Sequence, residues 1–251
     1  MIFADWLALA AIALAVGFFI GTVGVGGVLL IPALIWLAGV PVHQATATAL
    51  LSFLFTGLLG TGLYQRRGSI DWNITLPVLT GASIFSYLGA KANAMVNVHT
   101  LTLIIALVII FAGTYILFPA RHENGNHRDG RSRAQQFLLL IVGAFAGFGS
   151  GLSGAGGPLF SVPIMLALSF VPLAVVGTSQ VLQIVAALAG TMGNLQFGSV
   201  DFLHAGWITL FELAGVVAGV RAAHVASVTV LRRMAAGLCL LTGLLMLARS
   251  L

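Results

Sequence analysis

Two short stretches of the chain combine several glycines with a proline inside otherwise apolar sequence. They read GTVGVGGVLLIP, residues 21–32, and GLSGAGGPLFSVP, residues 151–163. Glycine permits left-handed backbone conformations and leaves its N–H group accessible. A helix that begins directly afterwards, near Val28 or Pro158, would aim unpaired N–H groups and its positive dipole end at the turn. Each stretch therefore predicts an anion-binding turn. The candidates are Gly24, Gly26, Gly27, Gly154, Gly156 and Gly157.

The alternative role for glycine in such sequence is close packing of helices. Glycines spaced four residues apart, as in GxxxG, let two helix backbones approach each other. The glycines for which we expect this role are Gly17, Gly147, Gly215 and Gly219. Packing is also the alternative for the turn glycines, but those cluster between two apolar segments and just before a short one.

Neutral polar side chains lie deep inside two apolar segments, 43–64 and 173–195. Neutral donors at membrane depth can hold an oxyanion without the desolvation cost of a charged side chain. Small Ser and Thr residues also form routine hydrogen bonds between helices, so both roles stay open for them. Gln180 and Gln183 are three residues apart and share a helix face. For these two amides we expect a place in a binding site or along a substrate pathway.

Glu212 is the one carboxylate well inside an apolar segment, about ten residues from either end. An ionisable residue at membrane depth is by default a functional candidate. Glu212 could carry a proton that couples transport. The alternative is a structural carboxyl group that stays protonated or pairs with Arg221, nine residues further along the helix.

Patterns typical of enzymes and metal sites fail in this sequence. The stretch GSGLSG, residues 149–154, fits GxGxxG, but no strand precedes it. The residues after Ser153 break the GxSxG pattern. There is no HExxH motif and no clustered Cys and His ligand set. We therefore expect neither an enzyme nor a bound metal.

The composition is that of an integral membrane protein. Hydrophobic residues make up 59% of the chain and charged residues 7%, against about 25% charged residues in soluble domains. Mean hydropathy is +1.09. The formal charge of +5 does not indicate nucleic-acid binding, because the 11 Lys and Arg residues lie in a few short loops.

The apolar runs predict an all-α polytopic protein of about ten segments. They are residues 5–23, 27–38, 43–64, 73–91, 99–118, 136–152, 157–169, 173–195, 203–221 and 229–249. About 20 helical residues cross a bilayer core. Segments 27–38 and 157–169 are too short for this, so they are better described as half-helices that return from a turn inside the membrane. Lipid tolerates no open backbone, which leaves helix as the expected state.

The basic residues indicate an orientation, because cytoplasmic loops are enriched in Lys and Arg. If the N-terminus lies outside and every segment reverses direction, nine of the 11 Lys and Arg residues fall on the cytoplasmic side. Omitting the two short segments lowers this number to seven. We therefore expect a multi-pass protein with both termini outside the cytoplasm.

The two halves of the chain are duplicates. With a shift of 130 residues, GSID at 68–71 falls on GSVD at 198–201, and Thr48 falls on Thr178. We expect an N-terminal repeat over 1–119, a cytoplasmic basic linker over 120–134 and a C-terminal repeat over 135–251. Five segments per half would make this an inverted repeat, the architecture of many secondary transporters. The small-residue helix faces are also compatible with a homodimer.

Taken together, the glycine–proline stretches and the GSID and GSVD turns resemble the sulfite exporter TauE/SafE family over essentially the whole chain. The resemblance implies a bacterial inner-membrane carrier for sulfur-containing anions such as sulfite, thiosulfate or organosulfonates, with no cofactor. Besides the turn glycines, it places substrate contacts at Thr48, Thr178, Ser179 and Gln180. GTSQ at 177–180 corresponds to ATAL at 47–50, so we expect the second half to supply more side-chain donors.

These expectations converge on a secondary transporter that moves a small anion by alternating access, with a proton or cation as a possible co-substrate. A passive anion channel is the alternative, because it would share every feature described above. Accumulation of the anion against a gradient distinguishes the two, since a channel cannot achieve it without a voltage.

Overall fold

The computed structural model describes residues 3–93, 128–153, 156–195 and 200–249, with single helical positions between 103 and 114. Its elements are α1 (Phe3–Val23), η1 (Gly27–Leu29), α2 (Leu30–Ala38), α3 (Val42–Arg66), α4 (Trp72–Asn93), α6 (Arg133–Ser153), α7 (Pro158–Ala167), α8 (Pro172–Leu195), α9 (Phe202–Val225) and α10 (Val228–Arg249). Within these residues the only β pairing is an isolated bridge between Arg128 and Phe170. The expected all-helical fold is confirmed.

Six of the described helices are long and apolar enough to cross a membrane. They are α1, α3, α6, α8, α9 and α10. Most of the expected segment at 99–118 lies outside the described residues. The chain is thus a multi-pass membrane protein, and the count of ten segments stays a prediction.

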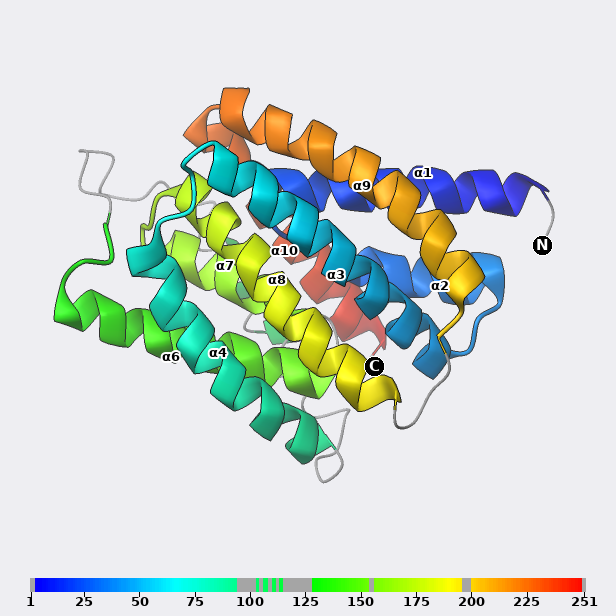
Figure 1. The fold of residues 1–251 in the computed structure, drawn as a ribbon, viewed down its shortest axis with the longest axis horizontal. Coiled ribbons are helices and arrows are strands. Elements are labelled where there is room, and N and C mark those ends of the chain that lie inside the picture. The colour runs from blue at the N-terminus through cyan, green and yellow to red at the C-terminus, as the bar shows by residue number, and fades with distance from the viewer. Residues whose placement is uncertain are drawn as a thin grey trace.

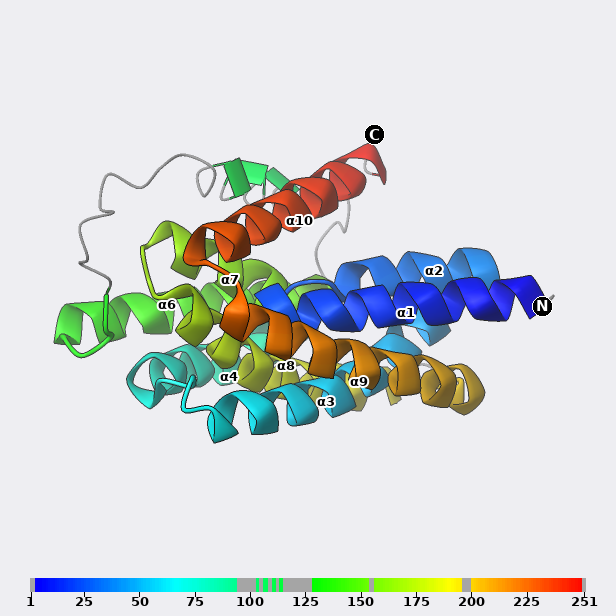
Figure 2. The ribbon, with the colours of Figure 1, turned by 90° about the horizontal axis from the view of Figure 1, so that it is seen from above.

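Two short helices lie within the bundle. α7 has 10 residues and α2 has 9, the latter preceded by the three residues of η1. At 1.5 Å per residue, 10 residues span about 15 Å, roughly half of a bilayer core. Figures 1 and 2 show α1 and α2 as a hairpin from the end of the molecule that holds the N-terminus, whereas the α6–α7 hairpin comes from the opposite end.

The long helices pack in pairs that repeat the sequence duplication. α1 packs along α9, α4 packs along α6, and α3 packs along α8. Under the 130-residue shift, α1 corresponds to α6, and α4 corresponds to α9. The first two pairs are therefore counterparts of each other, and each joins a helix of one half to a helix of the other.

Glycines set the close approach in both counterpart pairs. A Cβ atom at Gly17 would overlap the backbone of Glu212, and one at Gly147 would overlap the backbone of Ala82. Gly215 and Gly219 face the α1 backbone in the same way. The packing role predicted for these glycines is confirmed, and the two glycine contacts are themselves related by the 130-residue shift.

Candidate functional site

The turns of the two hairpins meet at one small cavity. The first turn follows α1, with Gly24 at φ +78°, and the second precedes α7, with Gly156 at φ +88°. Both angles are in the left-handed region that glycine adopts readily. The cavity is lined by Gly24, Val25, Gly26, Gly27, Phe53, Gly156, Pro158, Leu159 and Gln183. Four of the six glycines proposed from sequence therefore lie around a single space.

Unpaired backbone donors line this cavity. Among the described residues, the N–H groups of Val25, Gly26 and Gly27 have no hydrogen-bond partner. In the second turn, Gly156 lines the cavity, and no hydrogen bond from its N–H group to a described residue is found. α7 begins at Pro158, which suits a first helical position because it has no N–H to lose. Buried backbone donors are almost always paired in proteins, so N–H groups of this kind can donate to an acceptor such as an anion that enters the cavity.

The cavity volume is about 20 Å³. That is room for a water molecule. A sulfur oxyanion carries several oxygens around its sulfur and needs more space. Binding one here requires the two turns to move apart.

Phe53 and Gln183 are related by the duplication, and both line the cavity. They are 130 residues apart, so they are equivalent positions of α3 and α8. The Gln183 amide donates to the Phe53 carbonyl oxygen at 3.1 Å and to Thr56 Oγ1 at 2.8 Å. Both of its amide hydrogens are thus committed to α3, and the free donors at the cavity are the backbone N–H groups.

Ser179 and Gln180 of α8 contact the first turn and the end of α1. A Cβ atom at Gly24 would overlap Ser179 Oγ, so α8 packs directly on that glycine. Gln180 Nε2 donates to the Ile20 carbonyl oxygen at 2.8 Å. Neither side chain lines the cavity. Gly154 lies outside the described residues.

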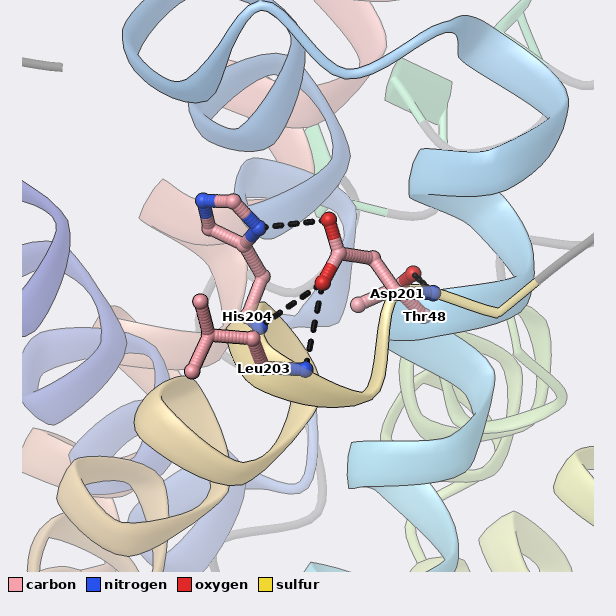
Figure 3. Close-up of polar contacts among 4 residues, drawn as sticks. All are labelled: Thr48, Asp201, Leu203 and His204. Carbon is pink, nitrogen blue, oxygen red and sulfur yellow. Dashed lines mark hydrogen bonds and ion pairs between the residues drawn. The ribbon is translucent and has the colours of Figure 1, made fainter.

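Thr48 and Thr178 lie in the second turns of α3 and α8 and contact the starts of α9 and α4, and neither lines the cavity. The Asp201 N–H donates to Thr48 Oγ1 at 3.1 Å, which joins α3 to the beginning of α9 (Figure 3). Thr178 Oγ1 lies 2.8 Å from Thr75 Oγ1 in the first turn of α4. The two threonines occupy equivalent positions and fasten equivalent junctions. Sequence alone could not separate this fastening role from a binding role.

Asp201 organises a polar cluster that the sequence did not reveal beyond a helix cap. Its Oδ1 atom accepts hydrogen bonds from the N–H groups of Leu203 and His204, each at 3.1 Å, as a helix N-cap does. Its Oδ2 atom lies 2.7 Å from His204 Nδ1 (Figure 3). The His204 ring stacks on Trp6 of α1 with a centroid distance of 5.0 Å. In the sequence, the D-x-x-H spacing of Asp201 and His204 at a helix start could have indicated this cluster.

The electrostatics of this cluster favour the ionised form of Asp201. Burial alone would raise its pKa, but the hydrogen bonds from the backbone and ring of His204 and from Leu203 outweigh it, and the pKa is lowered. Asp71 caps α4 in a similar way, because its Oδ1 atom accepts from the Asn73 N–H at 2.9 Å. Both aspartates therefore act as helix N-caps.

Glu212 lies at the middle of α9 and is fully buried. Among the described residues, neither of its carboxyl oxygens has a hydrogen-bond partner. Arg221 is exposed and forms no ion pair with it. The pairing with Arg221 considered from sequence is therefore wrong, and the polar group beside Glu212 is the Ser52 hydroxyl of α3.

Comparison with known proteins identifies the family of this chain. The sequence model for sulfite exporter TauE/SafE matches residues 8–246. This chain belongs to the TauE/SafE family. The TauE/SafE match covers both hairpins and all of the helices that form the cavity. No solved structure matches the chain.

Several proteins of similar sequence are named as probable membrane transporter proteins. The chain is 29% identical over 213 residues to the probable membrane transporter protein YdhB of Bacillus subtilis, which covers 82% of this chain and 85% of YdhB. It is 27% identical over 216 residues to the probable membrane transporter protein YunE of the same organism, covering 75% and 79%. A probable membrane transporter protein of Methanocaldococcus jannaschii, MJ0441, is 26% identical over 172 residues, covering 64% of this chain and 63% of MJ0441.

Proposed function

We propose that this TauE/SafE protein is a secondary transporter that carries a sulfur oxyanion or organosulfonate across the bacterial inner membrane by alternating access. The observation that carries the proposal is the meeting of two glycine turns with unpaired N–H groups at one buried cavity. Helix N-termini and free N–H groups bind anions without a positively charged side chain. A neutral site of this kind also releases its anion more readily than a buried arginine would.

We propose that the two halves form an inverted repeat, in which equivalent helices cross the membrane in opposite directions. The equivalent pairing of α1 with α9 and of α6 with α4 supports it, as does the approach of the two hairpins from opposite ends (Figures 1 and 2). In such transporters, half-helices meet at the midplane, and the two repeats rock against each other around the bound substrate. We place both termini outside the cytoplasm, as the distribution of basic residues predicts.

The cavity has room for about one water molecule, so the anion site is closed in this conformation. A carrier between transport steps would have such a closed site, and so would a channel with its gate shut. Transport kinetics distinguish the two.

Counterflow tests this proposal directly. Proteoliposomes containing the protein are loaded with an unlabelled anion, and entry of the labelled anion is followed for sulfite, thiosulfate, sulfate and a short sulfonate. We expect saturable entry of at least one sulfur anion, accelerated by the same anion inside. Entry that never saturates and gains nothing from internal anion would identify a channel, and no entry of any of the four would contradict the proposed substrate class.

A glycine pair provides the matched variants. Gly156→Ala leaves the added Cβ atom unobstructed, with Pro158 Cδ at 3.8 Å as its nearest neighbour, but holds it at φ +88°, a strain of about 1–2 kcal/mol. Gly206→Ala in α9 adds a Cβ atom in open space at an ordinary φ. We expect Gly156→Ala to insert normally and lose counterflow, and Gly206→Ala to retain it.

A further inference from the structure

Glu212 is the carboxyl group that the anion site does not use. It is fully buried at the middle of α9, and within the described part of the chain its two oxygens have no hydrogen-bond partner. An isolated carboxylate in such a place is very costly, so the group is neutral unless a cation joins it. Its counterpart in the first half is Ala82, which shows that the helix interface does not require a carboxyl group to pack.

Among the described residues of the helices packed along α9, no ionisable group lies beside Glu212. The helices packed along α9 are α1 and α3. In α1, Gly17 lies against the Glu212 backbone, and Asp5 is 12 residues away, about 18 Å along the helix. In α3, the residue beside Glu212 is Ser52. The other titratable groups of α3 are His43, Tyr64 and Arg66, each at least nine residues from Ser52. Those of α9 are His204, Arg221 and His224, each at least eight residues from Glu212.

Buried polar groups of α3 lie between Glu212 and the anion cavity. The Ser52 hydroxyl faces the Glu212 carboxyl and donates to the Ala49 carbonyl oxygen at 2.8 Å. Thr56 follows one turn later on the same face of α3, a rise of about 6 Å. Thr56 Oγ1 accepts from Gln183 at 2.8 Å, and Gln183 lines the cavity. All of these groups are buried.

We propose that Glu212 binds the proton that is transported together with the anion, which rests on the proposed function of the paired turns. A bound anion and an ionised carboxylate repel each other across this apolar interior. The anion therefore binds best when Glu212 is protonated, and by reciprocity the proton binds best when the anion is present. The proton enters as the anion enters, both cross together, and Glu212 releases its proton after the anion has left.

A proton suits this position better than a metal cation. Hard cations require several oxygen ligands around them. The described residues contain no group of three or more His, Cys, Asp or Glu side chains that could hold a metal ion. The lone carboxyl with one hydroxyl beside it can bind a proton without further ligands.

Glu212→Gln separates coupling from substrate binding, because the amide keeps the size of the side chain but cannot release a proton. In proteoliposomes with an acidic exterior, we expect the wild-type protein to accumulate the anion above its external concentration. Glu212→Gln should lose this accumulation and retain counterflow, which needs no net proton movement. Asp5→Asn, which removes a carboxylate from the first turn of α1, should still accumulate the anion.

Uphill accumulation by Glu212→Gln equal to wild type would overturn the coupling inference while leaving the transport proposal intact. Accumulation driven by a sodium gradient and indifferent to pH would overturn it as well. Absence of counterflow in the wild-type protein would instead count against the proposed function.

A second measurement needs no transport at all. The infrared C=O band of a protonated carboxyl group is recorded at neutral pH for protein in lipid, and the Glu212→Gln spectrum is subtracted. We expect a band that Glu212→Gln abolishes and Asp5→Asn leaves in place. Identical spectra for wild type and Glu212→Gln would show that Glu212 is not protonated there, and the inference would be wrong.

Discussion

At the scale of single residues, the Asp201 cluster is the clearest case of one side chain with several roles. It caps α9, faces His204 at 2.7 Å, and offers its own N–H group to Thr48. Through these contacts it joins the start of α9 to α3 and to Trp6 of α1. The cap was predictable from GSVD, but the contacts with Trp6 and Thr48 depend on how α1, α3 and α9 pack.

Two substitutions separate the cap of Asp201 from its charge. Asp201→Ala removes the cap and should cost about 1 kcal/mol, equivalent to a fall in Tm of about 2–4 °C in a chain of this size. Asp201→Asn keeps a capping side chain without the charge, so at neutral pH it should be closer to wild type. Thermal unfolding in detergent measures both.

Acidification distinguishes the same variants. The folded-state pKa of Asp201 is lowered from its ordinary value of 3.8. The unfolded chain therefore binds this proton first, and the stabilisation is present above pH 3.8 and lost as the pH falls through the native pKa. We expect the Tm of the wild-type protein to fall more steeply than that of Asp201→Asn below that pH. Parallel curves would show that the charge contributes nothing to stability.

At the scale of helices, glycine contacts decide how closely the counterpart pairs approach. Their role followed from GxxxG spacing in the sequence, because small residues at that spacing have one physical use in an apolar helix. The partner of each glycine helix did not follow, since spacing does not say which neighbour it meets. In the structure, α9 packs along α1 and α4 packs along α6.

Two glycines of α9 test this packing against each other. A Cβ atom at Gly215 would overlap the Leu14 carbonyl oxygen and lie 2.7 Å from the Phe18 backbone nitrogen. At Gly206 the Cβ atom meets nothing. Gly215→Ala should therefore force α1 and α9 apart and lower Tm, despite the better helix propensity of alanine. Gly206→Ala should gain about 0.5–1 kcal/mol, and equal Tm values for the two variants would contradict the close approach.

At the scale of the whole molecule, duplication explains both what the sequence predicted and what it left out. The helical segments and the two glycine turns were predictable because glycine and proline act locally. The cavity lining was only partly predictable: Gln183 was a candidate, whereas its equivalent Phe53 has no polar group to draw attention. The 130-residue shift alone would have identified Phe53. Thr48 and Thr178 look like binding residues in sequence, but they face helix starts because of the way α3 and α8 cross the bundle.

The same duplication concentrates function at the centre. Equivalent elements of both halves contribute to the cavity, and the features that break the equivalence, Gln183 and Glu212, lie on the second half. We expect this asymmetry to determine substrate choice and coupling, while the equivalent turns supply the anion site itself.

The most direct measurement is a structure of the protein in lipid with selenite, an electron-rich analogue of sulfite. The account predicts density for the selenium atom between the two turns, with its oxygens facing the N–H groups of Gly26 and Gly156 and the cavity widened around it. An ordered selenite bound elsewhere, with the two turns unchanged and the cavity empty, would contradict the central claim that the paired glycine turns hold the transported anion.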